Sequence, residues 1–170
     1  MAKGGTADAF GVAKADGVRL ALADEGAPFH IERFAAFQDF HDIDLPPAVL
    51  AHLRERNAAR PVARIVPDGG NERIIDRFLG MVERDHRLYA YHIDVVVTQL
   101  DERILFDPDG PDLPLLPLAA LDGGDFMCLD LREDGAPVVI WDHEASDDMA
   151  PAVHRIADDW DAFLAMLKEG

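Results

Sequence analysis

The sequence of 170 residues is poor in cysteine, in basic side chains and in long apolar runs. Its one cysteine, Cys128, excludes an internal disulfide and fits a reducing compartment, so we expect a cytoplasmic protein. No run approaches ~18 uninterrupted apolar residues and no secretory signal is recognisable, which predicts no membrane partner. Acidic residues number 33 against 16 basic ones, a formal net charge of -17. This charge repels phosphate backbones, so we expect no nucleic-acid binding; it favours a basic partner or serves solubility alone.

Four stretches have the apolar spacing of helices. They are residues 29–40, a segment from Pro46 to Asn57, residues 91–104 and residues 156–167. In the first, every third residue from Ile31 to Phe40 is apolar, which we take as one buried face. Asp44 is the expected cap of the second helix, and Asp158 or Asp159 that of the last. Val153 fits either the last helix or a short strand before it.

Short apolar runs bounded by turn residues predict strands. They lie at residues 63–67, 72–81, 114–121, 125–133 and 136–143. The order of elements predicts an α+β fold, a single domain with a mostly antiparallel or mixed sheet of about five to six strands flanked by about four helices. We assign residues 29–168 to this domain. Residues 1–28 form an amino-terminal extension, in which Asp16-Gly17 suits a hairpin turn.

The stretch from Asp122 to Leu131 reads "DGGDFMCLDL". Paired glycines allow positive φ, and flanking aspartates bond turn N–H groups, so we interpret 122–125 as a turn that leads into a strand. Alternation places Met127 and Leu129 on the core side. Cys128 is expected to pack as a small hydrophobe, because its neighbours are acidic and a reactive thiol needs nearby positive charge.

Asp142, His143 and Glu144 are the most tempting catalytic or metal-binding group. On a strand His143 points away from its two acidic neighbours, so the three cannot bind one metal without a kink. No second His/Cys cluster supplies the missing ligands. Asp142, His143 and Ser146 match a catalytic triad by residue type alone, without a nucleophile elbow. We therefore predict no catalytic residue, no metal and no cofactor.

Several motifs, in this order, resemble the SUKH superfamily, which contains a fungal cell-wall-assembly regulator and many bacterial immunity proteins. The matching residues are Leu45-Pro46 through Asn57, Pro117 to Ala119, Asp122 to Asp125, Met127 to Asp130, Trp141 to Glu144, and Ile156-Ala157 with Phe163-Leu164. The likeness spans residues 29–168. Two departures concern helix boundaries: Ala58 replaces a glycine that usually follows Asn57, and Asp159-Trp160 replaces Ser-Phe.

The resemblance implies a non-enzymatic protein-binding module, an immunity protein that neutralises a cognate toxin, such as a nuclease, by stoichiometric occlusion. The partner is then a basic toxin domain, bound through an acidic surface. The candidate contacts are Asp122, Asp125, Trp141, Glu144, Asp147 and Asp148, with Tyr91 as an alternative aromatic anchor to Trp141.

Two other classes of function stay open at this point. One is a regulatory scaffold of the kind the fungal relatives imply. The other is a small metal-dependent enzyme that uses His143 and nearby acids. The sequence does not decide between a monomer and a homodimer, nor between binding and solubility as the reason for the acidic surface.

Overall fold

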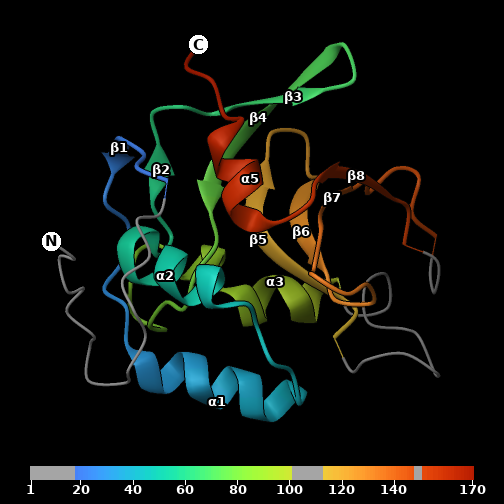
Figure 1. Ribbon diagram of the computed structural model, residues 1–170. Helices are drawn as coiled ribbons and strands as arrows, with labels where there is room; N and C mark the ends of the chain where they lie inside the picture. Colours follow the sequence, from blue (N-terminus) through green and yellow to red (C-terminus); the bar gives the residue numbers. More distant parts are fainter. Residues whose placement is uncertain (1–17, 101–112, 148–150) are drawn as a thin grey trace, which may run out of the picture.

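The computed structural model describes residues 18–100, 113–147 and 151–170 (Figure 1). Its elements are β1 (Leu22–Asp24), α1 (Ile31–His41), α2 (Pro47–Arg56), β2 (Arg60–Pro61), β3 (Ile65–Asp68), β4 (Asn71–Phe78), the 3-10 helix η1 (Tyr89–Tyr91), α3 (Ile93–Gln99), β5 (Leu115–Leu121), β6 (Phe126–Asp130), β7 (Val138–Trp141), β8 (Val153–Ala157) and α5 (Trp160–Ala165). The hairpin expected at Asp16-Gly17 lies outside the described residues.

An antiparallel sheet of six strands, in the order β3-β4-β5-β6-β7-β8, forms the centre of the fold. Strands β1 and β2 pair separately. Each strand of the large sheet neighbours the next along the chain, as hairpin connections favour. The predicted α+β class, with a mostly antiparallel sheet and about four helices, is confirmed. None of the described helices combines the length and the hydropathy needed to span a bilayer.

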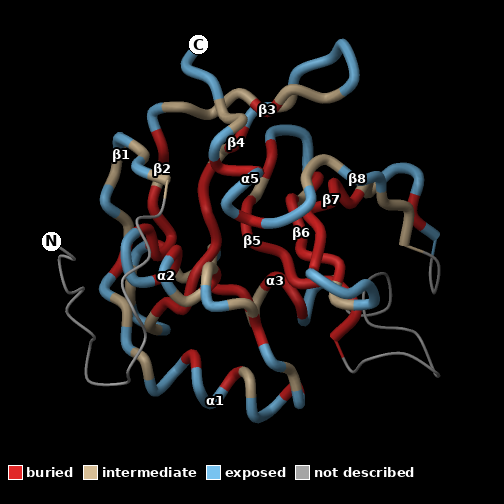
Figure 2. The backbone as a smooth tube through the Cα atoms, in the orientation of Figure 1, coloured by how far each residue is buried: buried red, intermediate tan, exposed pale blue. Residues whose placement is uncertain are grey.

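Strands β5, β6 and β7 are buried on both faces, and β4 joins them only in its second half, as the red parts of the backbone in Figure 2 show. On β6, Met127 and Leu129 are fully buried, as alternation predicts, but Cys128 and Asp130 on the other side are buried too. Cys128 therefore packs as the small hydrophobe expected of it. Burial, with a smaller contribution from Asp130, raises the pKa of its thiol.

Helices α2 and α5 meet over β4. Trp160 of α5 lies edge-on to His52 of α2, with ring centroids 4.9 Å apart, and Phe78 of β4 contacts the same imidazole at 4.6 Å. All three side chains are buried. Burial lowers the pKa of His52, so the imidazole stays neutral in this apolar environment. The closing helix of the chain thus completes the core.

Several expected element boundaries change in the structure. Helix α1 buries Phe34 and Phe37, but Phe40 is 82% exposed and does not share their face.

The helix caps differ from each other in outcome. The expected N-cap of α5 is confirmed at Asp159, whose Oδ1 accepts from the N–H of Ala162 at 2.8 Å. Asp44 does not cap α2, because that helix starts after Pro46 without any side-chain cap. The residues around Val153 form strand β8, which settles the alternative left open. Helix α3 starts at Ile93 instead of residue 91.

Residues 18–28, assigned above to the extension, pack against the domain where the structure describes them. Strand β1 pairs with β2, and Asp24 binds Arg77 at 3.0 Å. The N–H of Ala27 donates to the carbonyl of Asn57 at 2.8 Å. This segment is therefore integrated with the fold through both backbone and ion-pair contacts.

The side chain of Asn57 joins three segments that are distant in sequence. Its Nδ2 donates to the carbonyl oxygens of Ala27, Pro28 and Met81, at 3.2, 3.0 and 2.9 Å, and its Oδ1 accepts from the N–H of Met81 at 2.8 Å. The next residue, Ala58, adopts a positive φ of 53°. This conformation favours glycine, which accounts for the glycine that the related motif carries there.

Candidate functional site

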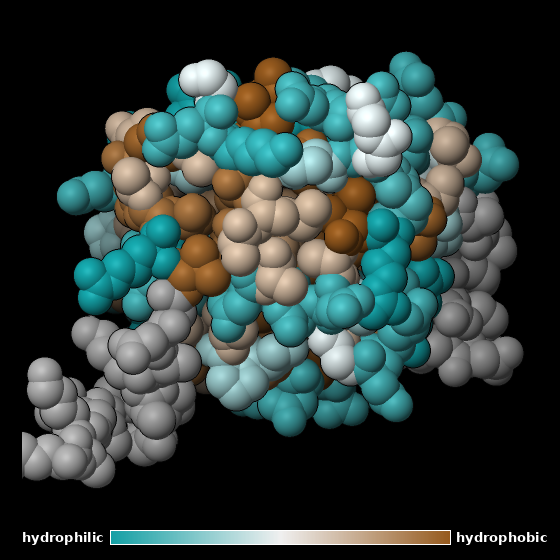
Figure 3. Space-filling model, turned by 45° about the horizontal axis from the view of Figure 1, so that its top comes forward, coloured by the Kyte–Doolittle hydropathy of each residue, from teal (hydrophilic) through white to brown (hydrophobic). Residues whose placement is uncertain are grey.

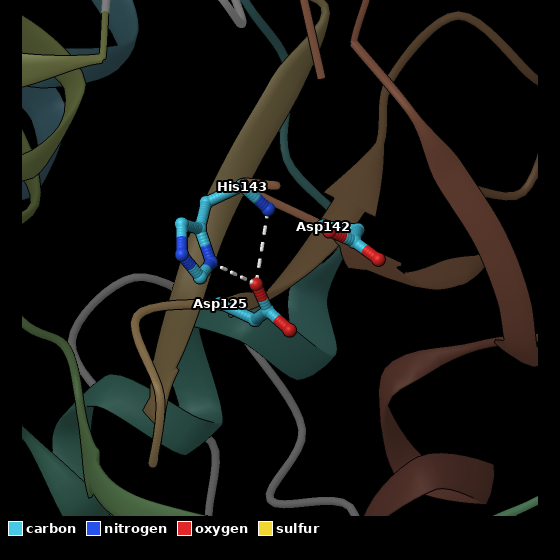
Figure 4. Close-up of side chains that lie close together, drawn as sticks. All are labelled: Asp125, Asp142 and His143. Carbon is cyan, nitrogen blue, oxygen red and sulfur yellow. Dashed lines mark hydrogen bonds and ion pairs between the residues drawn. The ribbon is translucent and has the colours of Figure 1, made fainter. Parts of the chain in front are cut away.

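The two motifs singled out in the sequence meet at one edge of the sheet. Strands β6 and β7 pair with Phe126 opposite Trp141, which brings the residues just outside these strands together. The carboxylate of Asp125 accepts on Oδ1 from the backbone N–H of His143 at 3.0 Å and from its Nδ1 at 2.6 Å (Figure 4). The turn before β6 is thus bonded to the residue that follows β7.

Two glycines allow the backbone conformation of this turn. Gly123 and Gly124 have φ of 95° and 97°, values that other residues rarely adopt. A Cβ on Gly124 would already be in van der Waals contact with the ring of His143, at 3.6 Å. The predicted turn at 122–125 is confirmed, and Asp125, its second aspartate, bonds to His143 just after the end of β7.

Arg73 of β4 completes the environment of Asp125. Its Nη1 donates to Asp125 Oδ2 at 2.8 Å, so both carboxylate oxygens are bonded, and the residue is only 5% exposed. Burial raises the pKa of Asp125, but the bonds from His143 and the charge of Arg73 outweigh it and leave this pKa below its ordinary value. Asp125 is therefore a buried, ionised carboxylate.

The ion pairs continue beyond Arg73. Its Nε donates to Asp68 Oδ2 at 3.3 Å, and the other oxygen of Asp68 lies 3.0 Å from Nε2 of His154. Asp68 ends β3 and His154 lies in β8, so this chain of contacts joins the two outermost strands of the sheet. It connects the β3–β4 hairpin to β8 and orients Arg73 beside Asp125.

Asp125, Asp142 and His143 place ligand-type atoms within 4.8 Å of one another, the distance at which a metal could be held. The bonding does not fit a metal. Oδ1 of Asp142 accepts from the N–H groups of Glu144 and Ala145, at 2.9 and 3.0 Å, and its carboxylate stands apart from the other two side chains in Figure 4. Both oxygens of Asp125 are bonded, one to a cation that opposes metal binding.

A buried carboxylate that bonds a histidine is also the orienting half of a catalytic triad. No nucleophile completes it among the described residues: Cys128 is buried on β6, and Ser146 donates its hydroxyl to the carbonyl of Asp142. The arrangement orients the imidazole of His143, whose side chain is 38% exposed, but no hydroxyl or thiol group among the described residues bonds to that ring. Structurally, it fastens the turn before β6 to the end of β7.

The six candidate contacts differ in accessibility. Asp122, Glu144 and Asp147 are exposed on the two connections that the Asp125–His143 contact joins. Trp141 is 1% exposed and packs in the core, with its ring 6.1 Å from that of Phe126. Asp148 lies outside the described residues.

The alternative anchor, Tyr91, is partly buried, and its hydroxyl donates to Asp76 at 2.8 Å. Burial therefore leaves Trp141 and Asp125 without a surface to offer a partner in this conformation. Sequence reasoning did not identify Arg73, Asp68 or His154 as neighbours of this site. The register of the β6–β7 hairpin was the one signal that could have paired Asp125 with His143.

Comparison with known proteins gives one match. A family model described as SMI1 / KNR4 family (SUKH-1) matches residues 28–166, which include every motif that carried the resemblance. No curated protein and no solved structure matches the chain. The match covers most of the chain, including the turn before β6, the end of β7 and helix α5. The chain therefore belongs to the SMI1 / KNR4 family (SUKH-1).

Proposed function

We propose that this chain is a non-enzymatic immunity protein that binds a basic toxin domain in a one-to-one complex and blocks its working surface. Family membership fits an immunity or regulatory binding module. The main observation behind the proposal is that buried and exposed polar groups at the candidate site differ in their bonding. Its potentially reactive groups bond one another, while the carboxylates of Asp122, Glu144 and Asp147 face solvent above them.

Charge supplies the physical argument for this partner. None of these three carboxylates has an ion pair with another described residue, so their field is not neutralised locally. An uncompensated acidic surface on a chain of net charge -17 accelerates encounter with a basic protein, and salt weakens that effect. A stable complex needs ~800 Å² from each partner, so these residues form only part of the interface.

One face of the molecule combines apolar and polar side chains. Figure 3 shows apolar side chains gathered among hydrophilic ones on the face that comes forward when the top of Figure 1 is turned toward the viewer. Protein interfaces commonly combine an apolar centre with a polar rim. Ile74, whose carbonyl accepts from the N–H of Asp122, is 39% exposed and places an apolar side chain beside the acidic turn.

The first experiment is co-purification from the native host, followed by binding kinetics with the recovered protein. We expect a basic toxin domain in a one-to-one complex that high salt dissociates. The variant Asp122→Asn/Glu144→Gln/Asp147→Asn should slow association about ten-fold at low salt and change dissociation little.

The matched control is Glu32→Gln/Asp85→Asn/Glu169→Gln, which removes the same charge from exposed positions elsewhere. Equal slowing by both variants would show that only net charge matters and would contradict an acidic contact at this site. Recovery of a partner that is not a toxin would favour the regulatory scaffold instead. Metal retained after chelation, and lost in His143→Ala, would favour the enzyme.

A further inference from the structure

A groove lies on another part of the surface, between the α1–α2 link and the β6–β7 turn. Its volume is about 340 Å³. Its apolar lining consists of Ile43, Pro46, Leu131 and Ala136. Its acidic lining consists of Asp42, Asp44, Glu133 and Asp134, and none of the described basic residues contributes to it. Ile43 and Leu131 also pack against the hydrophobic core, which gives the groove a supported apolar floor.

The acidic side chains of this groove are largely uncompensated. Oε2 of Glu133 lies 3.5 Å from Nη1 of Arg155, which makes a long ion pair. Asp42, Asp44 and Asp134 have no ion pair in the part of the chain that the structure describes. Local structure does not account for Asp44 either. The expected role as cap of α2 is not realised, and its carboxylate makes no hydrogen bond with another described residue.

The placement of the carboxylates decides which kind of ligand fits. Among the described residues, the one group of acids and histidines that converges closely enough for a metal is at Asp125, and no three groove carboxylates do so. The acidic groups therefore lie around an apolar surface and do not converge on a single position where an ion could bind. An arginine or lysine side chain suits this arrangement, because its aliphatic stem can lie on apolar surface while its charged head meets carboxylates.

We propose that this groove binds an arginine side chain presented by a protein partner, as a second contact separate from the acidic site at Asp122. The inference rests on the proposed function for the identity of that partner as a basic protein. The physical claim about the groove is independent of it: burial of an arginine stem supplies apolar contact, and the rim carboxylates supply charge-assisted hydrogen bonds.

The test uses two peptides and ¹⁵N-resolved NMR of the full chain. The probes are acetyl-Gly-Leu-Arg-Leu-Gly-amide and the same peptide with citrulline in place of arginine, which keeps the shape and removes the charge. We expect the arginine peptide to shift amide signals of residues 42–45 and 131–136. The citrulline peptide should bind about ten-fold more weakly.

The variant Asp44→Asn/Asp134→Asn should weaken the arginine peptide by a similar factor, and the control Glu32→Gln/Asp85→Asn should not. Both groove residues are exposed, so the variant is expected to fold. Equal binding of the two peptides to the unaltered chain, or shifts located elsewhere, would overturn the inference. Because no partner is needed, this outcome is separate from a failure to find a toxin.

Discussion

Replacing Asn57 with alanine tests whether one buried side chain holds the amino-terminal segment to the sheet domain. The substitution removes all four side-chain hydrogen bonds. The carbonyl of exposed Pro28 can be hydrated, but Ala27 is 9% and Met81 1% exposed, so the Ala27 carbonyl and the Met81 N–H and carbonyl lose these partners without gaining water. Each of these three buried groups costs about 1–3 kcal/mol, and the lower part of that range gives an expected loss of about 4 kcal/mol. Typical domains have only about 5–15 kcal/mol of unfolding free energy.

The assay is urea unfolding followed by circular dichroism and tryptophan fluorescence. At a slope of about 2 kcal/mol per molar urea, the midpoint should fall by about 2 M. The matched control is Asn71→Ala, since Asn71 is an exposed asparagine at the tip of the β3–β4 hairpin, and its loss should stay within about 0.5 kcal/mol. A loss below about 1 kcal/mol for Asn57→Ala at an unchanged slope would refute the reasoning.

Two further predictions concern the candidate site. Asp125→Asn should destabilise the fold by about 2 kcal/mol at neutral pH, against about 0.5 kcal/mol or less for exposed Asp122→Asn. Because the folded pKa of Asp125 lies below its ordinary value of 3.8, its advantage is complete above that pH and disappears as pH falls below it; an unfolding difference that persists in acid would contradict this. Cys128 should resist a thiol reagent in the native chain and react once unfolded, whereas rapid native reaction would show that β6 opens.

The sequence placed four helices at the right points along the chain, but it started the last one too early, because Ile156 and Ala157 belong to β8 and α5 covers Trp160–Ala165. Helix α1 shows where the pattern fails. A helix turns once in about 3.6 residues, so each step of three falls about 60° short, and three steps from Ile31 reach the opposite side at Phe40. Phe34 and Phe37 remain near the centre of the buried face, and Phe40 points into solvent.

Strand β8 was the element that local pattern could not determine. It is an outer strand in which no residue is fully buried, and exposed His154 and Arg155 interrupt its apolar run. Its pairing with β7 comes from tertiary contact, which a window of five residues does not contain. The buried strands β5 and β6, by contrast, have continuous apolar runs and turn signals on both sides, and both were predicted.

Of the candidate site, only the contact between the two ends of the β6–β7 hairpin could be predicted from the sequence. Strand alternation does not apply to Asp142 and His143, because the strand predicted over 136–143 ends at Trp141 and both residues lie in the connection that follows. A register with Phe126 opposite Trp141 is nevertheless enough to bring Asp125 beside His143. The rest of the network comes from strands far away in sequence. Arg73 and Asp68 are more than fifty residues before Asp125, so only the assembled sheet shows that they neutralise and orient it.

The same distinction bears on the meaning of the acidic surface. Some carboxylates, such as Asp24 and Asp125, are held by arginines, and their loss should cost stability. Others, such as Asp44 and Glu144, face solvent without an ion pair to another residue that the structure describes, and they cost little to neutralise. Removing three exposed charges changes the net charge only from -17 to -14, so solubility should barely respond wherever they are removed. Binding depends on position instead, which is why two variants of equal charge can separate an acidic surface that recognises a partner from one that only keeps the chain in solution.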